Sequence, residues 1–178
     1  MDADGADRAD RADGADGADG VDRIVAQWAV ERPDLDTGPM SVIGRIHRLG
    51  ALLDGGLRTV FAQVGLGNGD FDVLASLRRS GAPYRLTPTQ LTAAVMVTSG
   101  AVTKRVDRLE KAGLVSRTVS AEDGRGRLIE LTAGGRALVD RMLGVHWANE
   151  DRLLGALSAQ ERDQLAGLLR KLLLELEE

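Results

Sequence analysis

The residues with the clearest chemistry lie within the segment 86–131, where hydroxyls, cations and glycines recur at regular spacing. The run 101–111 has the apolar spacing of a helix. Three polar residues stand at its start or away from its apolar side: Ser99, Thr103 and Lys104. Hydroxyl and ammonium groups on an exposed helical face suit hydrogen bonds to phosphates and base edges. These residues are therefore predicted to contact the major groove of DNA.

Two further cations, Arg125 and Arg127, lie in a glycine-rich turn between two β-prone runs, 114–119 and 128–131. A hairpin whose tip carries guanidinium groups can reach a phosphate backbone or a minor groove. An ordinary hairpin with solvated arginines is the alternative. The helix-turn-helix pattern that precedes the hairpin favours contact with DNA.

A helix-turn-helix must hold these side chains in place. The first helix is predicted from Thr87, because Thr87 and Gln90 fit a capping box and Pro88 suits the first helical position. Residues 98–100 then end the first helix, and Gly113 suits a left-handed end for the second helix. Helix, turn, helix and basic hairpin in this order predict a winged helix-turn-helix, whose second helix typically enters the DNA major groove.

Helices are also predicted on both sides of this unit. The amphipathic runs are 21–31, 39–64, 70–80, 132–155 and 158–178. The last run carries a broad leucine face that must be buried against another surface. We expect a second copy of the chain to bury it, because a two-fold dimer matches a palindromic operator; folding back onto its own chain is the alternative. The predicted fold class is mainly α with a small β-hairpin wing, plus N- and C-terminal dimerisation helices.

Charge is unevenly distributed along this acidic chain of 178 residues, whose net charge is −4. Residues 78–127 hold ten Lys/Arg against four Asp/Glu, which is the electrostatic footprint of a DNA-binding unit. Residues 1–20 repeat Ala, Asp, Gly and Arg, cannot build a core, and are predicted to form a disordered tail. The remainder is predicted to be one domain, with N-terminal helices (21–64), a winged region (70–131) and C-terminal helices (132–178).

The composition argues against several other classes of protein. There is no cysteine, which removes disulfides, thiolate metal sites and cysteine redox switches. The only histidines are His47 and His146, and no nucleophile–base pair or phosphate loop stands out, so no metal, cofactor or enzymatic activity is expected. No run approaches the ~18 apolar residues that span a bilayer, and no signal peptide is recognisable. A cytoplasmic protein without a membrane partner is expected.

Three segments resemble the MarR family of transcriptional regulators: LTPTQLTAAVMVTSGAVTKRVDRLEKAGLVSR, AEDGRGRLIELT and TAGGRALV. The resemblance covers about residues 39–178. It implies an all-helical dimer with a winged helix in each subunit, usually a repressor released by a small ligand. The family often has two adjacent arginines after the wing aspartate, whereas here Gly126 separates them.

A narrower resemblance lies upstream. The segments WAVERPDLDTGPMSVIGRIHRL and GDFDVLASLRRSG are similar to the urate-responsive, PecS-like subgroup, which has an extra N-terminal helix that 21–31 would supply. The ligand site of this subgroup implies four residues here: Trp28, Asp72, Arg105 and, as an alternative cation, Arg108. An aromatic face, a cation and a polar partner together suit a planar purine anion. A ligand that breaks an Asp72–Arg105 pair would act directly on the recognition helix.

The expected function is thus that of a homodimeric repressor that binds a palindromic operator and is released by urate or a related purine. Trp28 as an aromatic anchor and Asp72 as a helix N-terminal charge are the structural alternatives to ligand binding. Two other functions remain open. One is the same fold responding to an aromatic carboxylate or other small anion, and the other is an effector-independent architectural DNA-binding protein.

Overall fold

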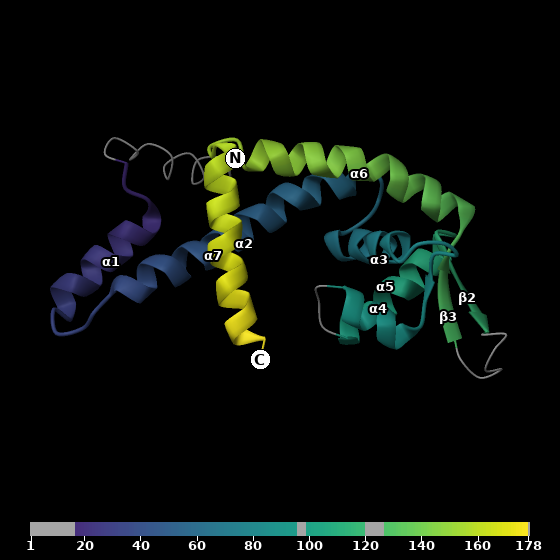
Figure 1. The fold of residues 1–178 in the computed structure, drawn as a ribbon, viewed down its shortest axis with the longest axis horizontal. Coiled ribbons are helices and arrows are strands. Elements are labelled where there is room, and N and C mark those ends of the chain that lie inside the picture. Colours follow the sequence, from purple (N-terminus) through teal and green to yellow (C-terminus); the bar gives the residue numbers. More distant parts are fainter. Residues whose placement is uncertain (1–16, 96–98, 120–126, 178) are drawn as a thin grey trace, which may run out of the picture. The chain divides into compact units, whose positions relative to one another are not determined.

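The computed structural model of the chain describes residues 17–95, 99–119 and 127–177, and for residues 68 and 99–101 it describes the backbone only. Most of the predicted tail, 1–20, therefore lies outside the described residues. The elements in chain order are α1 (Gly20–Glu31), α2 (Gly38–Ala62), α3 (Asn68–Arg79), β1 (Arg85–Leu86), α4 (Pro88–Ala94), α5 (Ser99–Lys111), β2 (Val115–Val119), β3 (Arg127–Leu131), α6 (Ala133–Leu153) and α7 (Ala159–Leu176) (Figure 1). The predicted mainly α fold with a small sheet is confirmed.

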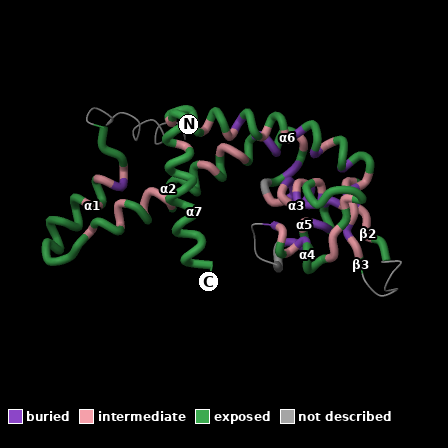
Figure 2. The backbone as a smooth tube through the Cα atoms, in the orientation of Figure 1, coloured by how far each residue is buried: buried purple, intermediate pink, exposed green. Residues whose placement is uncertain are grey.

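The chain divides into two compact units, and the division lies within α2 after Leu53. The first unit contains α1 and the start of α2. The second unit begins at Asp54 and contains the end of α2 and all later elements. Buried residues are concentrated in the second unit, on α3, α5 and α6 (Figure 2). No helix in the described part of the chain is long and apolar enough to cross a membrane.

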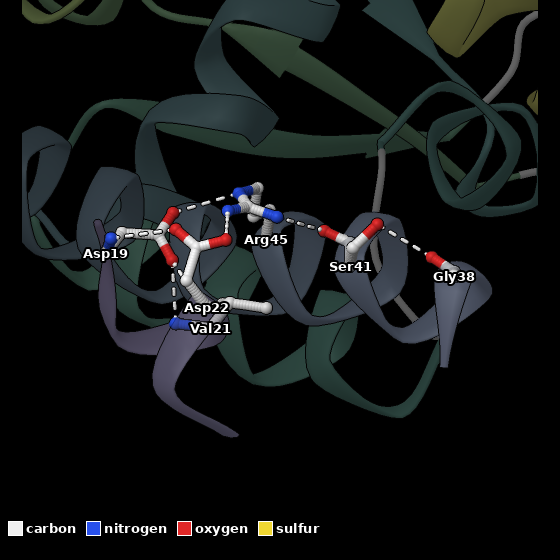
Figure 3. A network of polar contacts seen from close by, with 6 residues as sticks. All are labelled: Asp19, Val21, Asp22, Gly38, Ser41 and Arg45. Atoms are coloured by element: carbon white, nitrogen blue, oxygen red, sulfur yellow. Dashed lines mark hydrogen bonds and ion pairs between the residues drawn. The ribbon is translucent and has the colours of Figure 1, made fainter. Parts of the chain in front are cut away.

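In the first unit, polar contacts and one buried valine fix α1 to α2. Asp19 and Asp22 form a capping box at the start of α1. Arg45 of α2 donates to both carboxylates, at 2.9 Å to Asp19 and 2.6 Å to Asp22 (Figure 3). The hydrogen bond from Arg45 lowers the pKa of the Asp22 carboxyl. Val21 is buried where the two helices approach, facing Gly44.

The core of the second unit is built around α3, which contacts α4, α5, α6 and β3. Its central residues, Val73, Leu74 and Leu77, are fully buried. The rings of Phe61 on α2 and Phe71 on α3 stack with their centroids 4.3 Å apart, so the end of α2 joins this core. The predicted apolar side of α5 is also buried here, at Val102, Val106 and Leu109.

The sheet has three strands in the order β1-β3-β2, whereas the sequence predicted a two-stranded hairpin. β2 and β3 are antiparallel, from Val115 opposite Leu131 to Val119 opposite Arg127. β1 pairs with the other edge of β3 through only two residues. A strand of two residues has no alternation to reveal it, so the sequence prediction missed it.

The predicted helix ends are confirmed where a local capping interaction defines them. Thr87 accepts a hydrogen bond from the backbone N–H of Gln90 at 3.2 Å, and the Gln90 side chain accepts from the N–H of Thr87 at 2.9 Å. Gly113 has a φ of 72° at the end of α5. The helix predicted at 39–64 ends earlier, at Ala62, before a turn that needs the positive φ of Gly65.

Two adjacent glycines open α6, and only one of them is required by packing. A Cβ on Gly135 would lie 1.9 Å from the backbone carbonyl oxygen of Leu114. A Cβ on Gly134 would meet nothing closer than the Thr132 hydroxyl, at 3.7 Å. The first turn of α6 can therefore lie against the chain that leaves α5 only because Gly135 has no side chain.

We predict that Gly135→Ala lowers the free energy of unfolding by roughly 1–3 kcal/mol, because a backbone carbonyl cannot rotate away from the added methyl group. The matched variant Gly134→Ala should be neutral or raise stability by up to about 1 kcal/mol, through its better helix propensity. Urea denaturation followed by circular dichroism compares the two. Similar effects of both substitutions would contradict the close approach at Leu114.

Candidate DNA-binding face and effector cavity

The outward face of α5 carries the predicted DNA-binding side chains. Thr103 and Lys104 are exposed on the side opposite the buried stripe of the helix, as the helical period predicted. Ser99 is the first residue of α5, and its side chain lies outside the described part of the chain. An exposed hydroxyl and ammonium on a helix that follows α4 can meet a phosphate or a base edge.

The wing brings a further predicted residue to the same face. Arg127, the first residue of β3, is exposed, and it lines a hollow of about 190 Å³ together with Thr103. Thr92 of α4 and Arg117 of β2 also line this hollow. Arg125 lies outside the described residues. The structure therefore places two predicted DNA-binding side chains on one concave surface and adds Thr92, which the sequence did not single out.

Arg117 links β2 of the wing to α5. Its guanidinium is hydrogen-bonded to Asp107 and Glu110 of α5, and its backbone N–H donates to Glu110 at 3.2 Å. The two acids on α5 are thus paired internally by an arginine from β2. The three-residue spacing of Asp107 and Glu110, which places them on neighbouring positions of one helix face, was the available signal for this contact.

The ion pair expected between Asp72 and Arg105 is not formed within the described residues. The buried carboxylate that meets α5 is Asp70, which accepts from Arg108 at 2.7 Å and from the backbone N–H of Gly67 at 3.1 Å. The side chain of Asp70 is only 10% exposed, whereas that of Arg108 is 59% exposed. The N-terminal turn of α3 is therefore linked to α5 through Arg108.

Arg105 instead lies against the first turn of α3. A Cβ on Gly69 would lie 2.0 Å from its Cζ atom, so the guanidinium occupies the space that this glycine leaves. Its Nη1 atom is buried without a hydrogen-bond partner in the described chain. Its positive charge acts on Asp72 from a distance and lowers the pKa of that carboxyl, against the larger effect of burial. Arg105 is thus half-buried beside the apolar stripe, as predicted, but without its predicted partner.

Asp72 lies in a cavity of about 430 Å³ between α3, the end of α4 and α6. Phe71 and Trp147 supply aromatic surface to this cavity, and Arg79 and His146 supply its nearby cationic and imidazole groups. Burial raises the pKa of the Asp72 carboxyl, while Arg105, His146 and Arg79 act in the opposite direction. A volume of this size with an aromatic lining and few polar groups suits a small planar ligand.

The predicted ligand residues are only partly brought together. Asp72 lines the cavity, whereas Arg105 and Arg108 do not. Trp28 is 48% exposed on α1 and belongs to the first unit. The cavity has a different tryptophan, Trp147, which the sequence analysis did not assign. Within the described ranges, no cluster of acidic or histidine side chains is placed to hold a metal ion.

The raised pKa of Asp72 predicts a dependence of stability on pH. Since the folded protein favours the neutral carboxyl, the stability that this group contributes is present below its ordinary pKa of 3.8 and is lost as the pH rises through the folded-state pKa. Asp72→Asn is therefore expected to raise Tm at pH 7 and to lose this advantage in acid. Thermal melts across pH, with Asp163→Asn on exposed α7 as the charge-matched control, test this. A lower Tm at pH 7 would contradict it.

Comparison with known proteins gives a consistent assignment. A model of the MarR family matches residues 64–126. The HTH-type transcriptional regulator PecS of Dickeya dadantii is 44% identical over 146 residues, which cover 82% of this chain and 88% of PecS. PecS is a regulator of transcription and not an enzyme.

Solved structures of regulators show the same fold. The C80S mutant of Escherichia coli MarR in complex with operator DNA aligns with a TM-score of 0.66 at 29% identity, covering 82% of this chain and 97% of that one. BpsR of Bordetella bronchiseptica, described in relation to control of its DNA binding by 6-hydroxynicotinic acid, aligns with a TM-score of 0.67 at 25% identity, over 74% and 91%. With the PecS identity, the winged helix-turn-helix and the cationic face of α5, the chain belongs to the MarR family of DNA-binding transcriptional regulators.

Proposed function

We propose that this regulator is a cytoplasmic, homodimeric repressor that binds a palindromic operator and is released by a small anionic effector, with urate as the first candidate. The observation that carries the DNA-binding part is the shared face of α5 and the wing, where Thr103 and Arg127 line one hollow. Lys104 extends this face along α5. The complex of the related MarR mutant with operator DNA supports the same use of the fold here.

On this proposal, α5 enters the major groove with Ser99, Thr103 and Lys104 toward the DNA, and the wing residues Arg125 and Arg127 reach a minor groove or its phosphates. The concentration of positive charge in residues 78–127 supports it. The pairing of Asp107 and Glu110 with Arg117 also helps, because it reduces repulsion between the acids of α5 and phosphate.

A second copy of the chain is the proposed cover for the apolar faces of the terminal helices. The leucines of α7 are exposed in the single chain, which favours burial against a second copy over folding back onto the same chain. The exposed large apolar residues of α1, α2 and α7 are Ile24, Trp28, Val30, Val42, Ile43, Leu49, Leu52, Leu165, Leu168, Leu169, Leu172, Leu173, Leu174 and Leu176. Such an apolar area on terminal helices supports dimerisation.

The effector site is proposed around Asp72, in the cavity that Arg79 and Trp147 also line. Trp28, Arg105 and Arg108, which the resemblance implies as ligand residues, stay predictions, since they do not line this cavity. Similarity to PecS supports urate. An aromatic carboxylate is the second candidate, favoured by the related BpsR and its response to 6-hydroxynicotinic acid. An architectural protein without an effector is the remaining alternative, and the cavity at Asp72 argues against it.

Lys104→Ala is predicted to weaken binding to an operator duplex and to reduce the slope of log affinity against log salt by about 1, because one phosphate contact is lost. Arg141→Ala, which removes one positive charge from an exposed position on α6, serves as the control and should leave the slope unchanged. Fluorescence anisotropy at several salt concentrations measures both. An unchanged slope for Lys104→Ala would exclude it from the phosphate contacts.

The proposed function as a whole is tested by titrating the protein on the intergenic DNA upstream of its own gene. We expect a two-fold symmetric footprint, relieved by urate at concentrations that leave the protein folded. A parallel titration with 6-hydroxynicotinic acid and benzoate separates purines from aromatic carboxylates. A footprint that none of these compounds changes, with no ligand-induced shift in Tm, would favour the architectural alternative.

A further inference from the structure

The end of α4 is held by side chains that also line the Asp72 cavity. The backbone carbonyl of Ala94, the last residue of α4, accepts a hydrogen bond from the Arg79 guanidinium. The Ser76 hydroxyl donates to the same carbonyl at 3.4 Å. Ala94, Ser76 and Arg79 all belong to the lining of the cavity. The link between the helices of the helix-turn-helix begins directly after this point, since α4 ends at Ala94 and α5 begins at Ser99.

The two arginines at the end of α3 differ in what they bind. Arg78 donates to Asp140 at 2.6 Å, and its Cζ lies 4.9 Å from the ring centroid of Tyr84. Arg79 has a carbonyl as its hydrogen-bond acceptor, and within the described residues no carboxylate forms an ion pair with it. A guanidinium bound to a neutral carbonyl retains its full charge and can bind an anion. Of the two, Arg79 is therefore the cation available to a ligand.

The rest of the cavity restricts the chemistry of that ligand. Phe71 and Trp147 offer aromatic faces, which suit a flat ring. Asp72 offers a carboxyl group, which can pair with a ring N–H or a hydroxyl. The Nδ1 atom of His146 is buried and has no hydrogen-bond partner in the described chain. The ligand class that fits is a planar heteroaromatic anion with a donor on one edge and a carboxylate or enolate oxygen on another.

We propose that such an anion binds in the Asp72 cavity with its charged edge on Arg79, and that Arg79 thereby couples the cavity to the helix-turn-helix. A forked guanidinium–anion contact is stronger than a hydrogen bond to a neutral carbonyl. The ligand therefore draws Arg79 from Ala94 and removes a cation from the C-terminal end of α4, where the helix dipole favours one. This rests on the proposed function, because it names the residue through which the effector acts.

The coupling has two consequences that can be measured. The protein without ligand, in which Arg79 holds α4, is the form that binds the operator. Coupling between two ligands is reciprocal. The operator duplex must therefore lower the affinity for the small ligand by the same factor by which the small ligand lowers the affinity for the operator. A residue that served only to stabilise the fold would change Tm without changing this factor.

The experiment uses the full chain, its operator duplex, and urate and 6-hydroxynicotinic acid as probes. Arg79→Met keeps the length of the side chain and removes its charge and donors, and Arg79→Lys keeps the charge without the fork. Arg141→Met, at an exposed α6 position outside the cavity lining, is the matched control. Calorimetry measures probe affinity, anisotropy measures operator affinity, and circular dichroism verifies that each variant is folded.

We expect Arg79→Met to bind the effective probe roughly ten- to a hundred-fold more weakly, the range for loss of a charge-assisted hydrogen bond. Its operator affinity without probe should already be reduced, and the probe should change it little further. Arg79→Lys should retain operator binding and respond to the probe more weakly than wild type. Arg141→Met should behave as wild type.

Two results would overturn the coupling while leaving the regulator intact. One is a wild-type response to either probe that Arg79→Met and Arg79→Lys both retain in full. The other is binding of a probe that leaves operator affinity unchanged. If neither probe binds the wild-type protein or releases it from the operator, the planar-anion assignment is wrong, and so is the effector part of the proposed function. Trp147→Phe adds a check on where the probe binds. If the probe binds beside Trp147, quenching of tryptophan fluorescence by the probe should be lost in this variant.

Discussion

The burial of α3 is the constraint on which the second unit depends. Its central apolar residues are fully enclosed by α4, α5, α6 and β3. A close-packed helix of this kind cannot rotate or slide without opening voids, so the polar residues along it are held at fixed positions. Asp70 then contacts Arg108 of α5, and Arg79 contacts the end of α4. One buried helix thus positions both halves of the helix-turn-helix.

Packing also determines how the charged residues of α5 and the wing are paired. The acids of α5 face Arg117 of the wing, and the cations Lys104 and Arg127 remain exposed. Pairing the acids with Arg117 attaches the wing to α5 and partly neutralises the negative charge beside these cations. Gly135 completes the arrangement, since it allows α6 to begin directly against the chain that connects α5 to β2.

Features set by short-range interactions were predictable from the residues alone. The capping box of Thr87 and Gln90, the left-handed Gly113 and the buried stripe of α5 each depend on neighbours within a few positions. Exposure of Thr103 and Lys104 follows from the same helical period. The strand β1 was not predictable in this way, because its two residues become a strand only when β3 lies beside them.

The partners of the site residues depend on packing between distant elements. Asp70 and Asp72 are two positions apart on α3 and so point in directions about 200° apart. Which of them meets α5 is set by the rotation of α3 in the core, and the spacing of the acids carries no record of that rotation. Trp147 joins Asp72 for a similar reason, since α6 reaches α3 only after the wing has returned the chain. Periodicity and capping depend on neighbouring residues and can be predicted from the sequence. These pairings depend instead on how α3 packs among distant elements.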